Sequence, residues 1–255
     1  MAPVVHLYAL CWNEAAMLPF FFQHYDTFVD EYAILDDGST DGSTEMLRAH
    51  PRVKTSAMEV DGDSFLDQAT AIYNEFWKAS RGRADWVIVC NIDELVWHPQ
   101  ITGVLADRAA RGVTVMRCRG YEVVSLRFPR RGPLVETMRR AMPYGAMSKP
   151  CVFRPDAISE INFTPGRHWA NPSGDVVIED PSPLQLRHHK WLGYPYVWSR
   201  SRALDAALRP GDRQRIRAYG DSDLRLVRRY LARLYRARRI PNPPGWEERH
   251  DGAGR

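Results

Sequence analysis

Oxygen-bearing side chains gather directly after three apolar runs of the sequence. The most informative group, at residues 91–94, reads Asn-Ile-Asp-Glu and follows the unbroken apolar run at residues 86–90. Such a run is typical of a strand buried on both faces of a parallel sheet. Because side chains alternate along a strand, we expect Asn91 and Asp93 on one side of it, opposite Glu94. The first pair could bind a hard divalent cation at the carboxyl edge of the sheet, unless the segment only solvates the strand end.

Two further groups have the same placement. Asn13 and Glu14 follow the first predicted strand, and the run Asp-Asp-Gly-Ser-Thr-Asp-Gly-Ser at residues 36–43 follows the second. Carboxylates such as Asp36 and Asp37 can accept hydrogen bonds from a base or from ribose hydroxyls, while a metal ion neutralises a diphosphate. The alternative for the second group is an ordinary surface turn, which clusters of Asp and Gly favour.

The predicted helices and strands that would position these groups indicate an α/β protein. Apolar residues recur at helical spacing in some segments. Between them lie short runs rich in β-branched residues, which turn residues bound on each side. The predicted strands are residues 4–10, 32–35, 53–58, 86–90, 113–117, 121–128, 151–154, 176–178 and 184–188. The predicted helices are residues 15–28, 64–79 and 103–111, together with one that starts near residue 43. Parallel strands joined by helices would bring the three polar groups to one edge of a sheet.

Composition is that of an ordinary globular protein with one domain, or with one domain and an appendage. The 255 residues include 44% hydrophobic and 26% charged residues, enough to bury a sizeable core. No segment reaches the roughly 18 apolar residues needed to cross a bilayer, and no signal peptide is recognisable, so we expect a cytoplasmic protein. The four cysteines are widely spaced without a Cys-x-x-Cys pair, which indicates free thiols.

Together, the three polar groups resemble those of the family-two glycosyltransferases, which use nucleotide sugars and have the GT-A fold. Order and spacing agree over the first hundred residues, and a looser likeness reaches about residue 200. The later segments look most like a bacterial branch of the family; they include Lys149-Pro150, Arg154-Pro155, Gly166-Arg167-His168 and His188-His189-Lys190. One position departs from the pattern. Asn91 stands where the family usually has the first Asp of its metal motif, and an amide oxygen brings no charge to a cation.

The resemblance implies a GT-A (Rossmann-like) fold, with a mostly parallel sheet flanked by helices, a smaller irregular acceptor side and C-terminal helices. Residues 1–200 would form this domain, with the nucleotide-sugar half at residues 1–99 and the acceptor half at residues 100–200. A basic helical segment would follow at residues 201–240, and a mobile tail at residues 241–255. The implied activity is that of a hexosyltransferase, which moves a sugar from a nucleoside-diphosphate sugar to an acceptor hydroxyl with inversion, assisted by Mg or Mn.

The resemblance also implies roles for individual residues. The donor-binding residues would be Ala9, Asn13, Glu14, Asp36, Asp37, Gln68, Asn74, Asn91 and Ile92. The metal ligands would be Asp93, Asn91 and His188, the last because the family frequently uses a late histidine. The catalytic base would be Asp180, Glu179 or Glu94, and the acceptor-binding residues would be His168 and Trp169. The alternatives are exposed helix residues for Gln68 and Asn74, and structural histidines for His168 and His188.

The segment after Arg200 is rich in arginine. Its apolar residues recur every three or four positions, which predicts one packed stripe and a cationic opposite face. The stripe consists of Leu224, Val227, Leu231 and Leu234. The simplest interpretation is a docked helix with a solvated basic face; the alternatives are peripheral attachment to an anionic inner membrane surface or contact with a phosphate-bearing acceptor. A nucleic-acid partner is not expected, because no recognition motif accompanies the charge.

The acceptor is left open by the sequence and could be a small molecule, a glycan or a lipid-linked sugar. Two other functions are also open. A sugar-phosphate nucleotidyltransferase would show a glycine-rich loop with Arg and Lys near the first strand, and residues 11–16 contain none. A non-catalytic nucleotide-sugar-binding module is the second, because Asn91 weakens the expected metal site.

Overall fold

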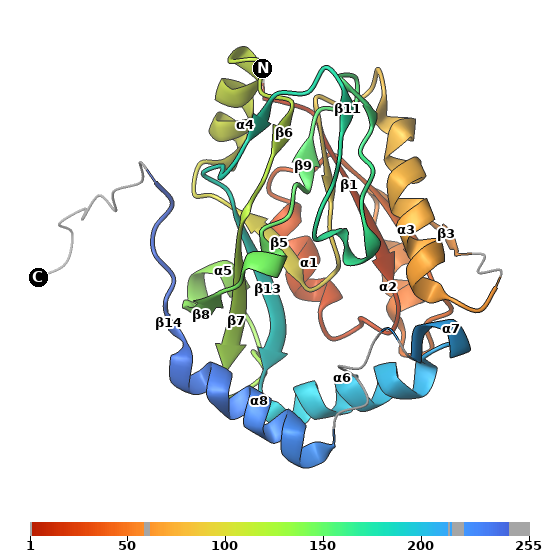
Figure 1. Ribbon diagram of the computed structural model, residues 1–255, viewed down its shortest axis with the longest axis vertical. Coiled ribbons are helices and arrows are strands. Elements are labelled where there is room, and N and C mark those ends of the chain that lie inside the picture. The colour runs from red at the N-terminus through yellow and green to blue at the C-terminus, as the bar shows by residue number, and fades with distance from the viewer. Residues whose placement is uncertain (1, 59–61, 214, 216–221, 245–255) are drawn as a thin grey trace, which may run out of the picture.

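The strands predicted within the first hundred residues lie next to one another in a seven-stranded sheet (Figure 1). The computed structural model describes residues 2–58, 62–213, 215 and 222–244, so most of the predicted tail at residues 241–255 lies outside the described residues. In order across the sheet, the strands are β12 (Ile178–Glu179), β6 (Val115–Met116), β9 (Val152–Phe153), β4 (Trp86–Val89), β1 (Val5–Cys11), β2 (Glu31–Asp36) and β3 (Val53–Ala57). Strands β4, β1, β2 and β3 run parallel, whereas β9 runs antiparallel to both of its neighbours.

Helices cover both faces of this sheet. Leu7 and Ala9 of β1 point to one face, while Tyr8 and Leu10 point to the other, and each pair belongs to its own hydrophobic core. The first core includes residues of α1 (Leu18–Tyr25), α2 (Ser43–Ala49) and α4 (Ile101–Ala110), and the second includes residues of α3 (Phe65–Glu75) and the 3₁₀ helix η1 (Phe76–Ser80). A strand buried throughout needs an apolar layer on each side, because its side chains alternate. The predicted mixed α/β fold, with a mostly parallel sheet flanked by helices, is confirmed.

A second, five-stranded sheet completes the architecture. In order, its strands are β14 (Arg238–Arg239), β8 (Arg140–Pro143), β7 (Arg119–Ser125), β13 (Gln185–Leu192) and β5 (Glu94–Trp97). The sequence pattern predicts β7 and β13 but not β5, because β5 follows β4 closely with no Gly or Pro between them. The helices α6 (Tyr194–Ala207) and α8 (Asp223–Arg236) share a core with this sheet around Trp191, Leu226 and Tyr230. The shorter elements are α5 (Leu134–Thr137), α7 (Pro210–Arg213), η2 (Gly145–Met147), η3 (Pro165–Arg167), β10 (Ile158–Glu160) and β11 (Ser173–Gly174).

The chain after residue 200 is joined to the rest of the fold. Helix α6 crosses the boundary proposed at that residue, and Asp212 of α7 contacts the start of α3. The Asp212 carboxylate accepts hydrogen bonds from the Phe65 backbone N–H at 2.7 Å and from the Ser64 hydroxyl at 2.8 Å. A carboxylate in this place satisfies backbone N–H groups that the first turn of a helix leaves unpaired.

Helix α8 packs through a stripe that only partly overlaps the predicted one, since Leu234 packs beside the core but Leu224 and Leu231 do not. Leu226 and Tyr230 are 2% and 4% exposed, whereas Leu224 and Leu231 are 60% and 55% exposed. The apolar arc of this helix is wider than the surface that it covers, so its edge stays outside the core. Spacing alone could not predict which part of the arc would be buried.

The state of the cysteines and the length of the helices can be compared with the expectations from composition. All four cysteines are buried free thiols, as predicted. The Sγ atoms of Cys118 and Cys151 lie 3.6 Å apart. Within the described part of the chain, no helix has both the length and the apolar character needed to cross a membrane.

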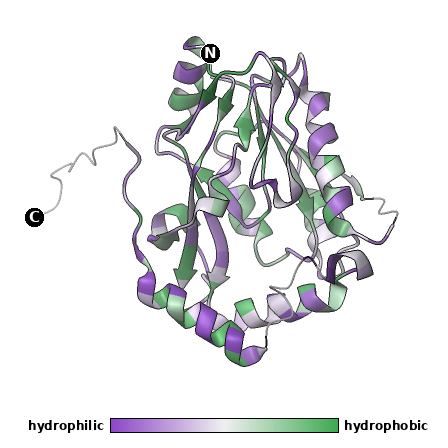
Figure 2. Cartoon of the chain, in the orientation of Figure 1, coloured by the Kyte–Doolittle hydropathy of each residue, from purple (hydrophilic) through white to green (hydrophobic). Residues whose placement is uncertain are grey.

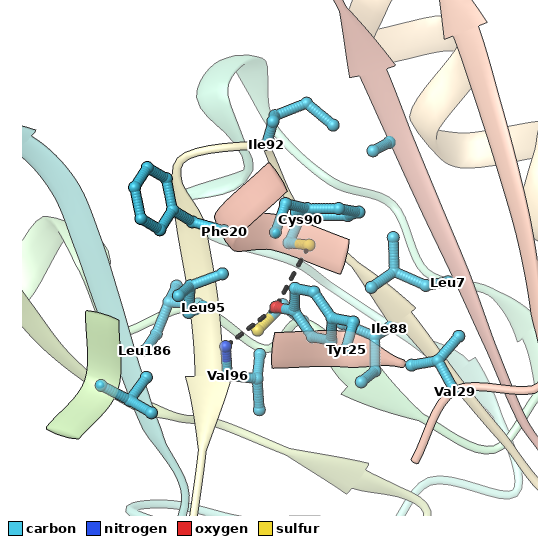
Figure 3. Close-up of a cluster of buried hydrophobic side chains, with 14 of the residues drawn as sticks. Leu7, Phe20, Tyr25, Val29, Ile88, Cys90, Ile92, Leu95, Val96 and Leu186 are labelled. Atoms are coloured by element: carbon cyan, nitrogen blue, oxygen red, sulfur yellow. Dashed lines mark hydrogen bonds between the residues drawn. The ribbon is translucent and has the colours of Figure 1, made fainter. Parts of the chain in front are cut away.

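The buried hydroxyl of Tyr25 fixes the chain between β4 and β5 (Figure 3). It accepts a hydrogen bond from the Val96 N–H at 2.9 Å and donates one to the Glu94 carbonyl at 2.9 Å. Ile92 is 1% exposed and packs into the same cluster. Because both a hydrogen-bonded hydroxyl and an apolar side chain anchor this turn, its polar residues are held in fixed directions.

Candidate active site

The loops that follow β1 and β2 are tied together at the carboxyl edge of the sheet. The Asn13 N–H donates to the Ser39 hydroxyl at 2.8 Å, and the Asn13 side-chain oxygen accepts from the Thr40 N–H at 2.7 Å. The Glu14 N–H donates to the Ser43 hydroxyl at 2.8 Å. Asn13 has a φ of 51°, in the left-handed region that Asn adopts more readily than most residues. The two predicted donor loops therefore form one structure.

Asp36 and Asp37 have different surroundings. Asp36 is 6% exposed, and its oxygens accept hydrogen bonds from the Ser39 and Thr44 hydroxyls at 2.5 and 2.8 Å. Asp37 is more open and has one long contact, 3.4 Å, to the guanidinium of Arg209. Burial raises the pKa of Asp37, and Arg209 opposes this shift. Of the two carboxylates, Asp36 shapes the loop and Asp37 is the one that a ligand could reach.

Helix α6 brings a cation to the same edge. Arg200 forms an ion pair with Glu14 and donates hydrogen bonds to the carbonyls of Trp12 at 2.9 Å and Asn13 at 3.0 Å. Burial raises the pKa of Glu14, whereas Arg200 opposes this shift and the nearby charge of Asp93 reinforces it. Glu14, Arg200 and Asp93 thus influence one another electrostatically. No local pattern in the sequence distinguishes Arg200 from the many other arginines of its segment.

The polar group after β4 is arranged differently from the alternation predicted along a strand. Strand β4 ends at Val89, and the chain turns at Ile92 and Asp93. Period-two alternation does not continue through a turn. Asn91 consequently pairs with Glu94, to which its N–H and side-chain amide donate at 3.2 and 3.3 Å. The predicted pairing of Asn91 with Asp93 is replaced by a pairing with Glu94.

Glu94 lies at the centre of a buried ionic cluster. It is 0% exposed, and its two oxygens contact Lys149 Nζ at 2.5 Å and Arg167 Nη2 at 3.0 Å. The amide oxygen of Asn91 accepts hydrogen bonds from Arg167 at 2.9 Å and from the Tyr73 hydroxyl at 3.0 Å. Burial acts to raise the pKa of Glu94, but the two cations outweigh it and lower the pKa to about 2. Glu94 is therefore an ionised carboxylate whose partners are inside the protein.

Asp93 faces a different partner. His188 of β13 lies opposite Glu94 in the ladder between β13 and β5, and the neighbouring His189 N–H donates to the Asp93 carbonyl at 2.7 Å. This register brings His188 Nε2 within 3.1 Å of Asp93 Oδ2. Burial acts to raise the pKa of Asp93, but His188 and then Arg200 reverse the effect and the net shift is downward. The Asp93 side chain keeps 20% of its surface exposed, so this pair borders the molecular surface.

Asp93 and His188 offer a carboxylate oxygen and an imidazole nitrogen to a cation. Ligand atoms of Asp93, Glu94 and His188 lie within 4.8 Å of one another, but both oxygens of Glu94 already contact cations. The 3.1 Å between His188 Nε2 and Asp93 Oδ2 is a hydrogen-bonding distance, and a bound cation would replace that hydrogen bond. The residues present therefore fit a divalent cation held by Asp93 and His188, while Asn91 directs its oxygen elsewhere.

Other predicted donor residues lie in or beside the core. The side chains of Ala9 and Ile92 are 0% and 1% exposed, so a ligand could meet only their backbone. Asn74 accepts from the Phe163 N–H at 2.7 Å and donates to the Phe163 carbonyl at 3.2 Å, which anchors a loop. Gln68 is half-buried, and its side-chain oxygen has no hydrogen-bond partner within the described residues. Asn74 thus has a structural partner, whereas the side-chain oxygen of Gln68 has none in the part of the chain that the structure describes.

The predicted acceptor residues, His168 and Trp169, directly follow η3. Trp169 is 62% exposed, and the guanidinium of Arg117 lies 4.5 Å from the centre of its ring. Arg117 also contacts the carboxylate of Asp180 at 3.4 Å. His168 shares a hydrogen bond of 2.6 Å with the Ala146 carbonyl. His168 and Trp169 line a cavity of about 370 Å³ with Gly145, Ala146, Thr164 and Pro165.

The three candidates for a catalytic base differ in their freedom to react. Glu94 is enclosed by the ionic cluster. Glu179 accepts two hydrogen bonds from Arg108 Nε, at 3.0 and 2.9 Å. Asp180 has 49% of its side chain exposed and one long contact. Among the three, the Asp180 carboxylate is the most open to an acceptor.

Comparisons with known proteins give only distant likenesses. No protein-family model matches the chain, and no curated protein matches it. Among solved structures, it resembles Staphylococcus aureus TarS residues 1–349 in complex with UDP-GlcNAc, with 12% identity, a TM-score of 0.46 and coverage of 80% of this chain and 66% of that chain. It also resembles S. aureus TarS residues 1–349 without a named ligand and S. aureus TarS, each with 12% identity over 80% of this chain, with TM-scores of 0.41 and 0.43 and coverage of 64% and 39% of those chains. The chain thus spans less than two thirds of each of these structures, and similarity this distant does not establish a shared activity.

Proposed function

We propose that this chain is a glycosyltransferase of the GT-A type, which moves a hexose from a nucleoside-diphosphate sugar to an acceptor hydroxyl with inversion. The observation that carries the proposal is the meeting of Asp37, Glu14 and the Asp93–His188 pair at the carboxyl edge of adjacent parallel strands. Open α/β sheets bind ligands at this edge. The sequence resemblance to family-two glycosyltransferases supports the same assignment independently.

On the donor side, Asp37 accepts hydrogen bonds from the base or the ribose of the nucleotide. Asp93 and His188 hold Mg or Mn, and such a cation offsets the charge of the diphosphate. Arg200 lies beside Glu14 and contributes a second positive charge close to Asp93. These residues bind and orient the donor, so that its anomeric carbon faces the acceptor side.

On the acceptor side, Trp169 provides an exposed aromatic face on which a sugar ring can pack. Asp180 removes the proton from the attacking hydroxyl as it approaches the anomeric carbon from the face opposite the diphosphate. Arg117 contacts both Trp169 and Asp180, which keeps the carboxylate beside the platform. Three strand spacings, about 14 Å, separate β4 from β12, a span that the donor sugar and the side chains bridge together.

The experiment is incubation with UDP-, GDP- and dTDP-sugars in the presence of Mn²⁺, with release of free nucleoside diphosphate as the readout. We expect release from one of these donors, and we expect Asp37→Ala to weaken binding of that donor with or without metal. Glu45→Ala is the matched control, because Glu45 is an exposed carboxylate of α2. Tight donor binding without release would favour a non-catalytic binding module, and incorporation of sugar phosphate into a nucleotide would favour a nucleotidyltransferase.

A further inference from the structure

Three large apolar side chains of α8 are exposed. They are Leu224, Leu231 and Tyr235, with exposed fractions of 60%, 55% and 83%. At 100° per residue they lie within about 40° of one another around the helix, so they form one strip along it. Trp198 of α6 is 42% exposed and donates from its indole N–H to Asp223 at the start of α8, at 2.8 Å. Trp198 therefore lies beside the start of α8, and these four side chains are here called the α8 strip.

Arginines lie directly beside the α8 strip. Arg228, Arg225 and Arg236 are exposed and occupy the next arc, about 80° wide, on the same side of the helix. Arg238 and Arg239 follow the helix and are also exposed. Asp223 is the sole acidic residue between positions 222 and 240. Figure 2 shows the resulting mixture of hydrophilic and hydrophobic residues along α8, at the lower rim of the molecule.

The side of α8 that faces the protein makes the contacts that dock the helix. Leu226 and Tyr230 are buried, and the Tyr230 hydroxyl donates to the Ser125 carbonyl at 2.6 Å. Arg233 contacts the Glu122 carboxylate at 2.7 Å and lies 4.0 Å from the centre of the Trp191 ring. The exposed leucines and tyrosine therefore contribute little to docking the helix. A contiguous exposed apolar strip on a helix indicates a surface for something else.

We propose that the α8 strip binds the surface of an anionic membrane. Leu224, Leu231 and Tyr235 enter the interface between headgroups and acyl chains, while the arginines beside them extend to lipid phosphates. A helix on the outer rim fits a flat surface. A second copy of the chain is disfavoured as the occupant, because it would bring the same arginines face to face. This inference does not depend on the proposed glycosyltransferase activity.

The test is co-sedimentation of the full chain with vesicles of phosphatidylcholine, alone or mixed with phosphatidylglycerol. We expect binding to the mixed vesicles to exceed binding to neutral ones by about tenfold or more. Leu231→Gln/Tyr235→Gln should lower the partition by about tenfold, and Arg228→Gln/Arg236→Gln by a similar factor. These positions are exposed, so circular dichroism should report unchanged folding.

Two substitutions at the opposite end of the molecule are matched controls. Ile178→Gln removes an apolar side chain that is 51% exposed, and Arg111→Gln removes a charge whose side chain is 67% exposed. Both should leave vesicle binding unchanged. Equal binding to the two vesicle types, or full binding by Leu231→Gln/Tyr235→Gln, would overturn the proposal. A concentration-dependent dimer in sedimentation velocity that this variant abolishes would also overturn it, by making a second copy the occupant.

Discussion

Two adjacent carboxylates, Asp93 and Glu94, have opposite environments. Glu94 is fully buried between Lys149 and Arg167, whereas Asp93 borders the surface beside His188. Both have a lowered pKa, although burial alone would raise both. For Glu94 the compensating charges are inside the protein and saturate its oxygens. For Asp93 the partner is a single imidazole, and part of the side chain is exposed, so this carboxylate is open to a ligand.

This difference assigns a structural role to Glu94 and leaves Asp93 as the residue that could bind a ligand. Three segments distant in sequence, around Asn91, Lys149 and Arg167, meet at the Glu94 cluster. The cluster fixes the turn on which Asp93 stands. Residues 91–94 thus contain one proposed cation ligand, Asp93, one core residue, Ile92, and two members of the internal ionic cluster, Asn91 and Glu94. Substitutions at neighbouring positions should therefore have effects of different kinds.

The largest expected effect is on stability. Glu94→Gln leaves Lys149 and Arg167 buried without their counter-ion, and we expect a loss of about 3–5 kcal/mol in the free energy of unfolding. Asp93→Asn, the same chemical change one residue earlier, should cost about 1 kcal/mol or less, because Asp93 is partly solvated. Urea denaturation at pH 7 measures both. Equal losses would mean that the two carboxylates do not differ in role.

The same comparison predicts a pH dependence. Because the pKa of Glu94 falls from 4.5 to about 2 on folding, the folded state binds fewer protons than the unfolded state between these values. The contribution of Glu94 is complete above about pH 4.5 and is lost as the pH falls toward 2. Glu94→Gln should therefore unfold with a shallower dependence on pH in this window. The free energy of unfolding of both proteins should be measured from pH 5 downward. If it fell equally steeply with pH in the two proteins, this assignment would be contradicted.

A third prediction concerns the catalytic base. If Asp180 removes the acceptor proton, Asp180→Asn should bind donor normally and transfer sugar about a hundredfold more slowly. Glu179→Gln, at the neighbouring position paired with Arg108, is the control and should keep most of the activity. Initial rates with saturating donor, together with donor titrations, distinguish the two variants. Full activity of Asp180→Asn would remove it from the mechanism.

The smallest effect is expected at Asn91. Its amide oxygen already accepts two hydrogen bonds, from Tyr73 and Arg167, so Asn91→Asp should leave the metal concentration for half-maximal nucleotide binding unchanged. His188→Ala should raise that concentration, because it removes one of two proposed ligands. Titration of nucleotide binding against Mn²⁺ compares them directly. A lower metal requirement for Asn91→Asp would place Asn91 in the coordination shell after all.

The sequence predicts much of the fold and part of the site. Strand β4 and the loops after β1 and β2 follow from local apolar runs and turn residues, because their signals lie within a few residues. The Glu94 cluster could not be predicted, since Lys149 and Arg167 meet Glu94 only through the tertiary fold. The direction of the Asn91 side chain could not be predicted either, because the alternation of side chains ends with β4 at Val89. Arg200 carries no local signal that separates it from other arginines.

Calorimetric titration of UDP and GDP with and without Mn²⁺ tests the central claim most directly. For the wild-type protein we expect the cation to tighten binding of one of these nucleotides. Asp93→Asn should lose this tightening, while Glu94→Gln, measured at a temperature where circular dichroism shows it folded, should keep it. Tightening that survives Asp93→Asn, or that disappears in folded Glu94→Gln, would contradict the assignment of the cation to Asp93 and of the scaffold to Glu94.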